Sequence, residues 1–436
     1  MSEKHKIVSK ELVIPFVLVT ALFFLWALPN NLNDILIPQF MKTFELNRLQ
    51  AGLVQSAFYM GYFLLAMPAA IIMDRYNYKT GLIIGLILFA TGCFMFYPAT
   101  HIAQYWLFLF ALFIIASGLA FLETGANSFI AVLGDADTSE QRLNFSQAFN
   151  PLGAMSGALI GTVFIFSGTE LNNVQVEAMK AAGTYQNYLH SEIMRISPPY
   201  LVIGSIILLW AFLLWRTKFP SDKKLETDQE VQNHGKLSAL FKYPHFYKGV
   251  LAQFFYVGAQ VGTWSFLIQY VKDYLHKPEK EAGIYLFISL LVFGIGRFVA
   301  TALMKVVEPK KLMGIYSFIN IALVANAVLN PGIMGGITLV MSSFFMSLMF
   351  PTIFALGIKG LGPNTKLGGS MIIMAIIGGA VWTPIMGLIS DKTHSMALAM
   401  IIPIISYLFI AYYSFIGSKP SGPLFEGHHN GPIASH

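Results

Sequence analysis

Apolar runs of roughly twenty residues recur along almost the whole chain, and they restrict its possible folds more than any other feature. A helix of this length spans the hydrocarbon layer of a bilayer. The strands of a membrane β-barrel would be about half as long and alternate in polarity, so the pattern excludes that fold. Hydrophobic residues make up 56% of the 436-residue chain and charged residues only 11%. Soluble domains carry about a quarter charged residues. We therefore predict an all-α membrane protein.

Twelve such runs can be placed, and we expect each to cross the membrane once. Their approximate limits are 12–38, 49–73, 80–98, 104–132, 144–168, 198–217, 247–271, 281–304, 311–330, 333–358, 366–389 and 395–416. A strongly charged segment between the sixth and seventh runs is the candidate linker. We predict an N-terminal six-helix bundle, a cytoplasmic linker, a C-terminal six-helix bundle and a polar tail, over residues 1–218, 219–246, 247–418 and 419–436.

The positions of Lys and Arg predict the orientation of the chain. With the N-terminus in the cytoplasm, the inner loops hold roughly twice as many of these residues as the outer loops, as the positive-inside rule requires. The net charge of +6 therefore arises from short loops and indicates no nucleic-acid partner. Residues 1–10 are polar and no small-residue cleavage site follows, so we predict no removable signal peptide. With Cys93 as its only cysteine, the chain forms no internal disulfide.

The two halves of the chain resemble each other with an offset of about 230 residues. The segment "ALFFLWALPNNLNDILIPQF" from Ala21 can be laid on "AQFFYVGAQVGTWSFLIQYV" from Ala252. Further matches join the segments that begin at Phe121 and Phe350, those that begin at Gly61 and Gly296, and the regions of Gly153 and Gly379. Because each half has an even number of spans, both enter the membrane from the same side. Such parallel repeats are typical of transporters that bind a substrate between two bundles and rock around it.

The first span carries an unusual polar stretch, "WALPNNLNDILIP", at residues 26–38. Asn30, Asn31 and Asp34 lie three and four residues apart and share one face of a helix. A charge inside the bilayer costs at least roughly 3 kcal/mol, so it needs a reason. Amides and carboxylates bind hydroxyl groups, and Pro29 predicts a break that opens the helix toward a cavity. We predict that Asn31 and Asp34 contact a hydroxylated substrate; the alternative is a polar cluster that ties helices together.

Two other charged side chains lie well inside predicted spans, those of Glu123 and Arg297. Asn127 follows Glu123 by one turn, in "LETGAN". Low-dielectric surroundings favour a protonated carboxyl group, which releases its proton when a cavity fills with water. We predict that Glu123, together with Asp34, acts in proton coupling, and that Asn127 and Gln147 contact the substrate. A permanently neutral Glu123 and a purely structural Gln147 are the alternatives.

Three charged residues are predicted to act in gating. Asp74 and Arg75 lie in a short inner loop, "MDRYNYKTG", where Asp74 could cap one helix while Arg75 and Lys79 meet the carbonyl ends of others. A solvated turn is the alternative. Arg297 lies about two turns from the inner end of its span, close enough to reach the membrane surface. We predict a structural or gating ion pair for Arg297 rather than a substrate contact.

The corresponding face of the seventh span is aromatic and uncharged. It carries a row of side chains at spacings of three, four and four residues: Gln253, Tyr256, Gln260 and Trp264. Ser265 stands where the first span has Asp34. A sugar ring has hydroxyl edges that suit amides and C–H faces that suit an aromatic surface. We predict that Gln260 and Trp264 bind a sugar, with helix packing as the alternative for Trp264.

Six stretches carry a resemblance to a known family: "FFLWALPNNLNDILIPQF", "LNRLQAGLVQSAFYMGYF", "FLETGANSF", "RLNFSQAFN", "AQFFYVGAQVGTWSFLIQY" and "FPTIFALGIKGLG". They resemble the L-fucose permeases, the fucose:proton symporter family of the major facilitator superfamily. The resemblance runs through nearly all twelve spans. It implies the fold of that superfamily, a bacterial inner-membrane location, and uptake of a neutral sugar with a proton by alternating access.

The resemblance also assigns roles to particular residues. It implies that the essential Asp and Glu of the family fall on Asp34 and Glu123, its first-helix Asn on Asn31, and its fifth-span Gln on Gln147. Two departures bear on the sugar. The chain reads "LETGANS" where these permeases read "LETAANP", and Phe350 stands where they have tyrosine.

We therefore predict a proton-coupled sugar symporter and not an enzyme, because no nucleophile–base pair or metal-binding cluster lies in the spans. No cofactor or metal is expected. Na⁺ coupling and another sugar, such as glucose, galactose or an amino sugar, are the alternatives within transport. A sugar sensor is the alternative from another class, although the polar segments are too short for a signalling domain. The expected partners of this monomer are a monosaccharide, a proton and the lipid bilayer.

Overall fold

The computed structural model describes residues 12–133, 142, 145–219, 240–304, 306–361 and 364–420. Three predicted features fall outside these residues wholly or in part: the side chain of Asp74, most of the linker, and the tail beyond residue 420. Helices dominate the described part. The first half contains α1 (Val13–Thr43), α2 (Arg48–Arg75), α3 (Tyr78–Ile102), α4 (Tyr105–Val132), α6 (Phe149–Ile160) with the π-helical turn η3 (Gly161–Ile165), α7 (Asn173–Ala181), α8 (Tyr185–Met194) and α9 (Ser197–Arg216).

The second half repeats this order with more interruptions. It contains α11 (Pro244–Leu275), α12 (Glu279–Leu303), α13 (Pro309–Leu329), α14 (Ile333–Met346), α15 (Met349–Ile358), α16 (Thr365–Met374), η6 (Ala375–Ile377), α17 (Gly378–Thr393), α18 (Met396–Ala399), α19 (Ile401–Tyr412) and η7 (Tyr413–Gly417). Short breaks thus divide each of the last three spans, which were predicted as continuous.

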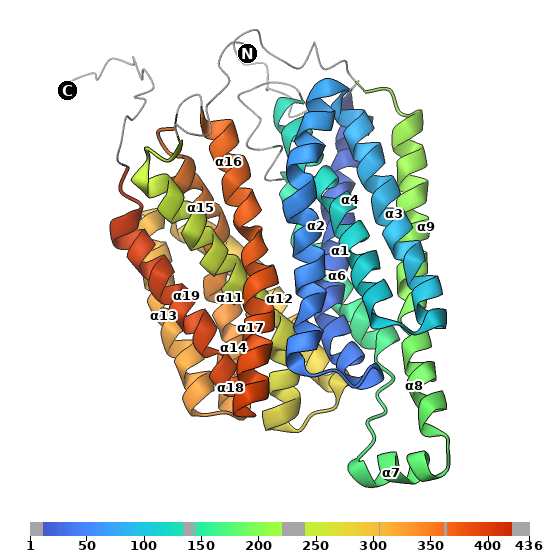
Figure 1. Ribbon diagram of the computed structural model, residues 1–436. Helices are drawn as coiled ribbons and strands as arrows, with labels where there is room; N and C mark the ends of the chain where they lie inside the picture. The colour runs from blue at the N-terminus through green and yellow to red at the C-terminus, as the bar shows by residue number, and fades with distance from the viewer. Residues whose placement is uncertain are drawn as a thin grey trace, which may run out of the picture.

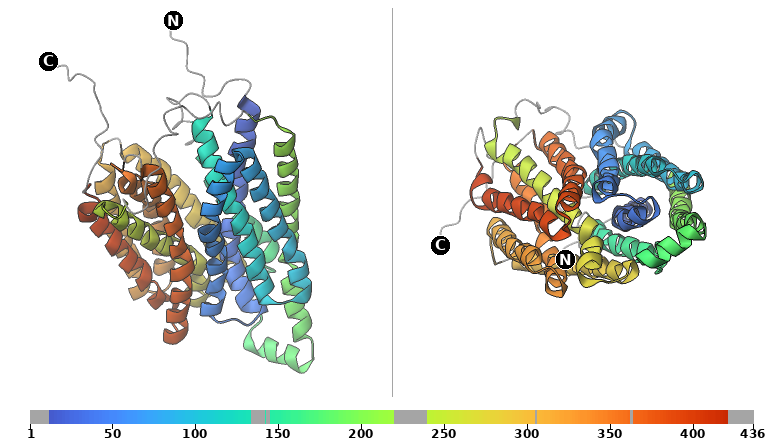
Figure 2. Two further views of the ribbon diagram at one scale, coloured as in Figure 1. Left: turned by 45° about the horizontal axis from the view of Figure 1, so that its top comes forward. Right: turned by 60° about the horizontal axis from the view of Figure 1, so that its bottom comes forward.

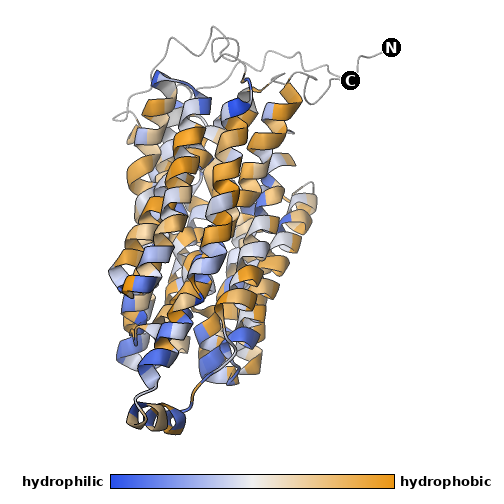
Figure 3. Ribbon diagram, turned by 90° about the vertical axis from the view of Figure 1, so that its right-hand side faces the viewer, coloured by the Kyte–Doolittle hydropathy of each residue, from blue (hydrophilic) through white to orange (hydrophobic). Residues whose placement is uncertain are grey.

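The prediction of twelve spans is confirmed. In the described part, eleven helical segments are long and apolar enough to cross a membrane. The remaining span is α11, with 32 residues, whose glutamines and glycines lower its hydropathy. Apolar residues dominate the middle of the helices, and polar residues gather toward both ends (Figure 3). Large apolar side chains such as those of Ile71, Phe298 and Leu329 point outward, where lipid would surround them.

The spans form two bundles that lie side by side, the first six in one and the last six in the other (Figures 1 and 2). The described chain begins and ends at the same end of the molecule, which we call the terminal end (Figure 1). We call the opposite end the far end. Helices α1, α2 and α6 face α11, α12 and α17 across the interface. In the polar segment between the fifth and sixth spans, α7 and α8 lie at the far end, and α8 leads into α9 (Figure 1).

Corresponding close contacts in the two bundles reflect the repeat. A Cβ atom at Gly61 of α2 would lie 2.6 Å from the carbonyl oxygen of Phe113 in α4. A Cβ atom at Gly296 of α12 would lie 2.5 Å from the carbonyl oxygen of Phe344 in α14. Only glycine permits these helices to approach so closely. The two glycines matched in the sequence therefore serve the same packing role in each half.

The predicted break at Pro29 is wrong. Helix α1 continues through both Pro29 and Pro38 and ends at Thr43, five residues beyond the predicted limit. Proline removes one backbone hydrogen bond, but the helix around it is buried on most sides. Packing against neighbouring helices thus keeps the helix intact through both prolines.

Candidate functional site

A cavity of about 260 Å³ lies between the two bundles, near the middle of the spans. Its walls come from α1, α2, α4 and α6 on one side and from α11, α12, α15 and η6 on the other. Eight of the ten predicted site residues line it: Asn31, Asp34, Glu123, Asn127, Gln147, Gln260, Trp264 and Arg297. Two tyrosines of α2, Tyr59 and Tyr62, also line the cavity but were not predicted from the sequence.

Asp34 connects the two bundles. Its Oδ1 atom accepts a hydrogen bond from Gln55 Nε2 of α2 at 2.8 Å and another from Ser265 Oγ of α11 at 2.8 Å. Gln55 Nε2 also donates to Ser265 Oγ, at 2.8 Å. Asp34 is only 3% exposed, and Gln55 and Ser265 are fully buried or nearly so. The sequence paired Asp34 with Ser265 as repeat equivalents, and in the structure these equivalents meet.

Glu123 lies on α4 next to a chain of amides. Asn127 Nδ2 donates to the Glu123 carbonyl oxygen at 2.8 Å, and Gln147 Nε2 donates to Asn127 Oδ1 at 3.2 Å. The Tyr62 side chain lies beside Glu123 and Asn30. Its hydroxyl is buried beside these two side chains and lines the cavity. The hydroxyl is therefore placed to contact a ligand or the Glu123 carboxyl group.

Tyr59 lies near both carboxyl groups of the cavity. Its hydroxyl is close enough to interact electrostatically with both Asp34 and Glu123. Its ring stacks on that of Tyr62, with 6.2 Å between the ring centroids. The side chains become more exposed toward the terminal end: Asp34 is buried, Glu123 and Asn127 are partly exposed, and Gln147 is exposed. The cavity is therefore more open on the side of Glu123 and Gln147 than on the side of Asp34.

The wall from the second half is aromatic, as predicted. Trp264 Nε1 donates to Ser343 Oγ at 3.0 Å, which fixes the orientation of the indole ring. Its ring meets that of Phe293 edge to face, with centroids 5.1 Å apart. Part of the Trp264 surface remains open to the cavity. The side chain is thus both a packing element and an available aromatic surface.

The residues predicted to act in gating behave differently from one another. Arg297 lines the cavity with its guanidinium carbon 5.1 Å from the centre of the Phe293 ring, and within the described residues no carboxylate lies within 4 Å of it. The predicted ion pair of Arg297 is therefore not formed with any described residue. Arg75 is exposed at the end of α2 and does not line the cavity. Lys79 donates to the carbonyl oxygens of Trp215 and Thr217 at the end of α9, as expected for a lysine that meets a helix end, but within one bundle.

Comparisons with known proteins agree with this architecture. The family model of the Major Facilitator Superfamily matches residues 18–365. The chain is 43% identical to the L-fucose-proton symporter of Escherichia coli, over 94% of each chain. It is 35% identical to the L-fucose-proton symporter of Haemophilus influenzae, over 94% of this chain and 98% of that one. It is also 34% identical to a glucose/galactose transporter of Brucella abortus, over 92% of this chain and 93% of that one.

A solved structure resembles the whole chain. It is a crystal structure of FucP, a transporter of the major facilitator superfamily, in the outward conformation, 41% identical, with a TM-score of 0.69 over 93% of this chain and 99% of that one. The crystal structure of a D-xylose-proton symporter, 14% identical, has a TM-score of 0.72. The latter likeness concerns the fold alone.

Proposed function

Because the chain belongs to the major facilitator superfamily, we propose that it is a proton-coupled symporter that imports a neutral monosaccharide by alternating access. Two of its close relatives are L-fucose-proton symporters, which makes L-fucose the first sugar to test. The observation that carries the proposal is the cavity itself. Two carboxyl groups and several amides face an aromatic surface across it, and this combination suits a hydroxylated ring.

We further propose that the terminal end faces the cytoplasm of a bacterial cell and that the protein functions as a monomer in the inner membrane. The excess of Lys and Arg in the loops of that end supports this orientation. We also propose that residues 1–218 and 247–418 form the two bundles, with a linker between them and a polar tail from residue 419. In this orientation the structure is open toward the inside, because exposure increases from Asp34 toward Gln147.

One observation supports the inward-open assignment. The described hydrogen bonds and ion pairs that join the bundles lie at the middle and far end, not at the terminal end.

The geometry suggests how the sugar and Asp34 act together. In the inward-open state, the Ser265 hydroxyl donates to Asp34 Oδ1. When the bundles separate on the outer side, Ser265 moves away with the second bundle and a sugar hydroxyl takes its place. Asn31, Asn127, Gln147 and Gln260 would bind other hydroxyls, and Trp264 would cover a C–H face of the ring.

Glu123 is the proposed carrier of the coupling proton. It lies on the more open side of the cavity, where release toward the cytoplasm is direct. Tyr59 and Tyr62 lie near it, Tyr59 also lies near Asp34, and they could relay the change in charge from one carboxyl group to the other. Once the sugar and the proton have both left, the empty carrier with deprotonated Glu123 returns to the outside, where it binds the next proton.

The test is sugar-stimulated proton uptake by the purified protein in proteoliposomes. Glu123→Gln mimics the protonated acid but cannot titrate. We expect it to exchange labelled L-fucose across the membrane but to lose proton uptake and net accumulation. Glu281→Gln is the matched control, because Glu281 forms an exposed ion pair with Lys277 and lies far from the cavity. Proton uptake that persists in Glu123→Gln would remove this role from Glu123.

Two alternatives within transport are tested by the same vesicles. Replacing sodium by choline distinguishes H⁺ from Na⁺ coupling, since a sodium-coupled carrier would lose uptake. A competition panel of deoxy and hydroxymethyl sugars distinguishes L-fucose from the glucose and galactose that another relative is named for. Binding without counterflow of labelled sugar would instead indicate a sensor.

A further inference from the structure

Two matching sets of polar contacts join the bundles at the far end. The first surrounds the start of α2. Asn47 caps this helix by accepting from Gln50 N, which leaves the first two amides free. Asp391, at the end of α17 in the other bundle, accepts from both: Arg48 N donates to Oδ1 at 3.0 Å and Leu49 N to Oδ2 at 2.8 Å. The Arg48 guanidinium group also pairs with Asp273 at the end of α11.

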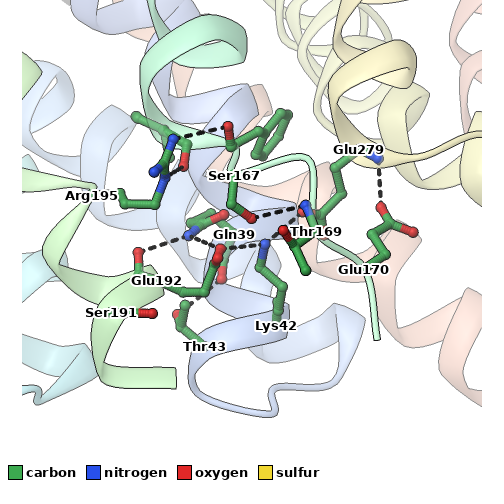
Figure 4. Close-up of polar contacts among 12 residues, drawn as sticks. Gln39, Lys42, Thr43, Ser167, Thr169, Glu170, Ser191, Glu192, Arg195 and Glu279 are labelled. Carbon is green, nitrogen blue, oxygen red and sulfur yellow. Dashed lines mark hydrogen bonds and ion pairs between the residues drawn. The ribbon is translucent and has the colours of Figure 1, made fainter. Parts of the chain in front are cut away.

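The second set surrounds the start of α12. Pro278 precedes this helix and provides no side-chain cap. Glu170, just after η3 in the first bundle, accepts from Glu279 N at 2.5 Å (Figure 4). The Glu279 carboxylate pairs with Lys42 of α1 at 2.8 Å and with Lys272 of α11 at 2.7 Å. We call these two sets the α2 clasp (Arg48, Asp273, Asp391) and the α12 clasp (Lys42, Glu170, Glu279).

The two clasps are related by the internal repeat. Arg48 and Glu279 are the first residues of α2 and α12, and they are separated by the same 231 residues as Asp34 and Ser265. Lys42 and Asp273 have the same separation. In each clasp, a carboxylate from the end of the fifth span of one half caps the second span of the other half. Each clasp also has an ion pair whose cation comes from the first bundle and whose anion comes from the second, Arg48 with Asp273 and Lys42 with Glu279. In the α12 clasp, Lys272 of the second bundle additionally pairs with Glu170 of the first at 3.4 Å.

Glycines one turn further along each helix let the clasps close. A Cβ atom at Gly52 of α2 would lie 2.9 Å from Pro384 Cα in α17. At the equivalent position of α12, a Cβ atom at Gly283 would collide with the Thr162 side chain in η3. Because glycine has no side chain, the first turns of α2 and α12 can approach the opposite bundle closely enough for the carboxylates of Asp391 and Glu170 to reach their amides.

We propose that the two clasps are the outer gate of the carrier, and that Glu170 and Asp391 hold it closed by capping helices of the opposite bundle. This inference rests on the proposed function and orientation. A carboxylate at a helix N-terminus is stabilised by the free amides and by the helix dipole. When the outer side opens, water replaces each partner. The clasps therefore stabilise one state without making the transition irreversible.

The test measures access to the cavity from outside. In a Cys93→Ala background, Val261→Cys places one thiol in the lining of the cavity, where it is 5% exposed. Intact cells expressing this parent are treated with a membrane-impermeant methanethiosulfonate reagent. We expect Asp391→Asn and Glu170→Gln each to increase the labelling rate roughly two- to thirtyfold, the range for loss of a capping carboxylate. Glu281→Gln, on the same face of the protein but in a local ion pair, should match the parent.

Gly52→Ala should also increase the labelling rate, because its new Cβ would push α2 away from Pro384 of α17 without removing a charge. Retained L-fucose exchange and a monodisperse profile in detergent show that each variant is folded. Labelling rates in all three folded variants equal to that of the parent would overturn the gate. If instead the parent labels rapidly from outside and the variants label more slowly, the terminal end does not face the cytoplasm. That result would overturn the proposed orientation, and with it the proposed function, rather than the gate.

Discussion

Replacing Ser265 by Ala tests whether Asp34 alternates between this hydroxyl and the sugar. The Ser265 side chain is fully buried, and its Oγ donates to Asp34 Oδ1 at 2.8 Å while accepting from Gln55 Nε2 at 2.8 Å. A hydrogen bond to a charged group contributes about 1.5–3 kcal/mol. Because the partners belong to different bundles, the bond stabilises only the state that is closed on the outer side. Its loss should favour the outward-open state by roughly ten- to 150-fold.

We expect Ser265→Ala to bind L-fucose more tightly than the parent, because the competing hydroxyl is absent and more molecules are open to the outside. Isothermal titration calorimetry on the purified protein measures the affinity, and labelling of Val261→Cys measures the population. Ser317→Ala is the matched control, since Ser317 is also fully buried but bonds to the Met313 carbonyl within α13. Weaker sugar binding with unchanged labelling would refute the exchange and leave Ser265 as a direct sugar ligand.

Three further predictions address the cavity and the packing. Trp264→Ala should weaken sugar binding about tenfold by removing the aromatic surface, whereas Trp264→Phe should lose less; both are measured by calorimetry. Tyr62→Phe should reduce sugar-driven proton uptake, because the Tyr62 hydroxyl lies beside the Glu123 carboxyl group; equal proton uptake would contradict its role. Gly61→Ala should lower the free energy of unfolding of the detergent-solubilised protein by roughly 1–3 kcal/mol, because the new Cβ would lie 2.6 Å from the Phe113 carbonyl oxygen. A thermal melt should show no such loss in the control Gly294→Ala, where the nearest atom to the new Cβ would be 3.9 Å away.

The sequence was sufficient to find the carboxyl groups of the cavity. A charge in a membrane span is rare and costly, so Asp34 and Glu123 stand out without any structure. The helical spacing of Gln260 and Trp264 likewise indicated a common face, and both line the cavity. These predictions rest on properties that one helix carries by itself.

Contacts between helices were harder to predict. Gln55, Tyr59 and Tyr62 lie on α2 at spacings of four and three residues and share a helix face, but this spacing does not show that the face meets Asp34 or Glu123. The ion pair predicted for Arg297 requires a partner whose position depends on how the bundles tilt. The interruptions near Ser347 and Ala375 depend on packing within the second bundle, and the apolar sequence there reads as continuous helix. The clasps depend on both the repeat and the conformation.

The pairing of Asp34 with Ser265 explains why an otherwise symmetric repeat carries its charge on one side only. Repeat-equivalent residues near the axis between two halves approach each other when the halves close, and here they come within hydrogen-bond distance. Two carboxylates at this distance repel each other unless they share a proton. An acid in both halves would therefore oppose closure of the outer side, whereas a hydroxyl opposite the acid assists it.

Ser265→Asp tests this argument directly. We expect the variant to close on the outer side only when Asp34 and the introduced carboxylate share one proton, so labelling of Val261→Cys from outside should be fast at high pH and slower at low pH. Ser265→Asn is the control, because an amide of nearly the same size can donate to Asp34 without a charge, and its labelling should depend on pH no more than that of the parent. Rapid labelling of both variants at every pH would mean that the size of the side chain, and not its charge, prevents closure. The asymmetry of the repeat would then reflect the space available at position 265 rather than electrostatics.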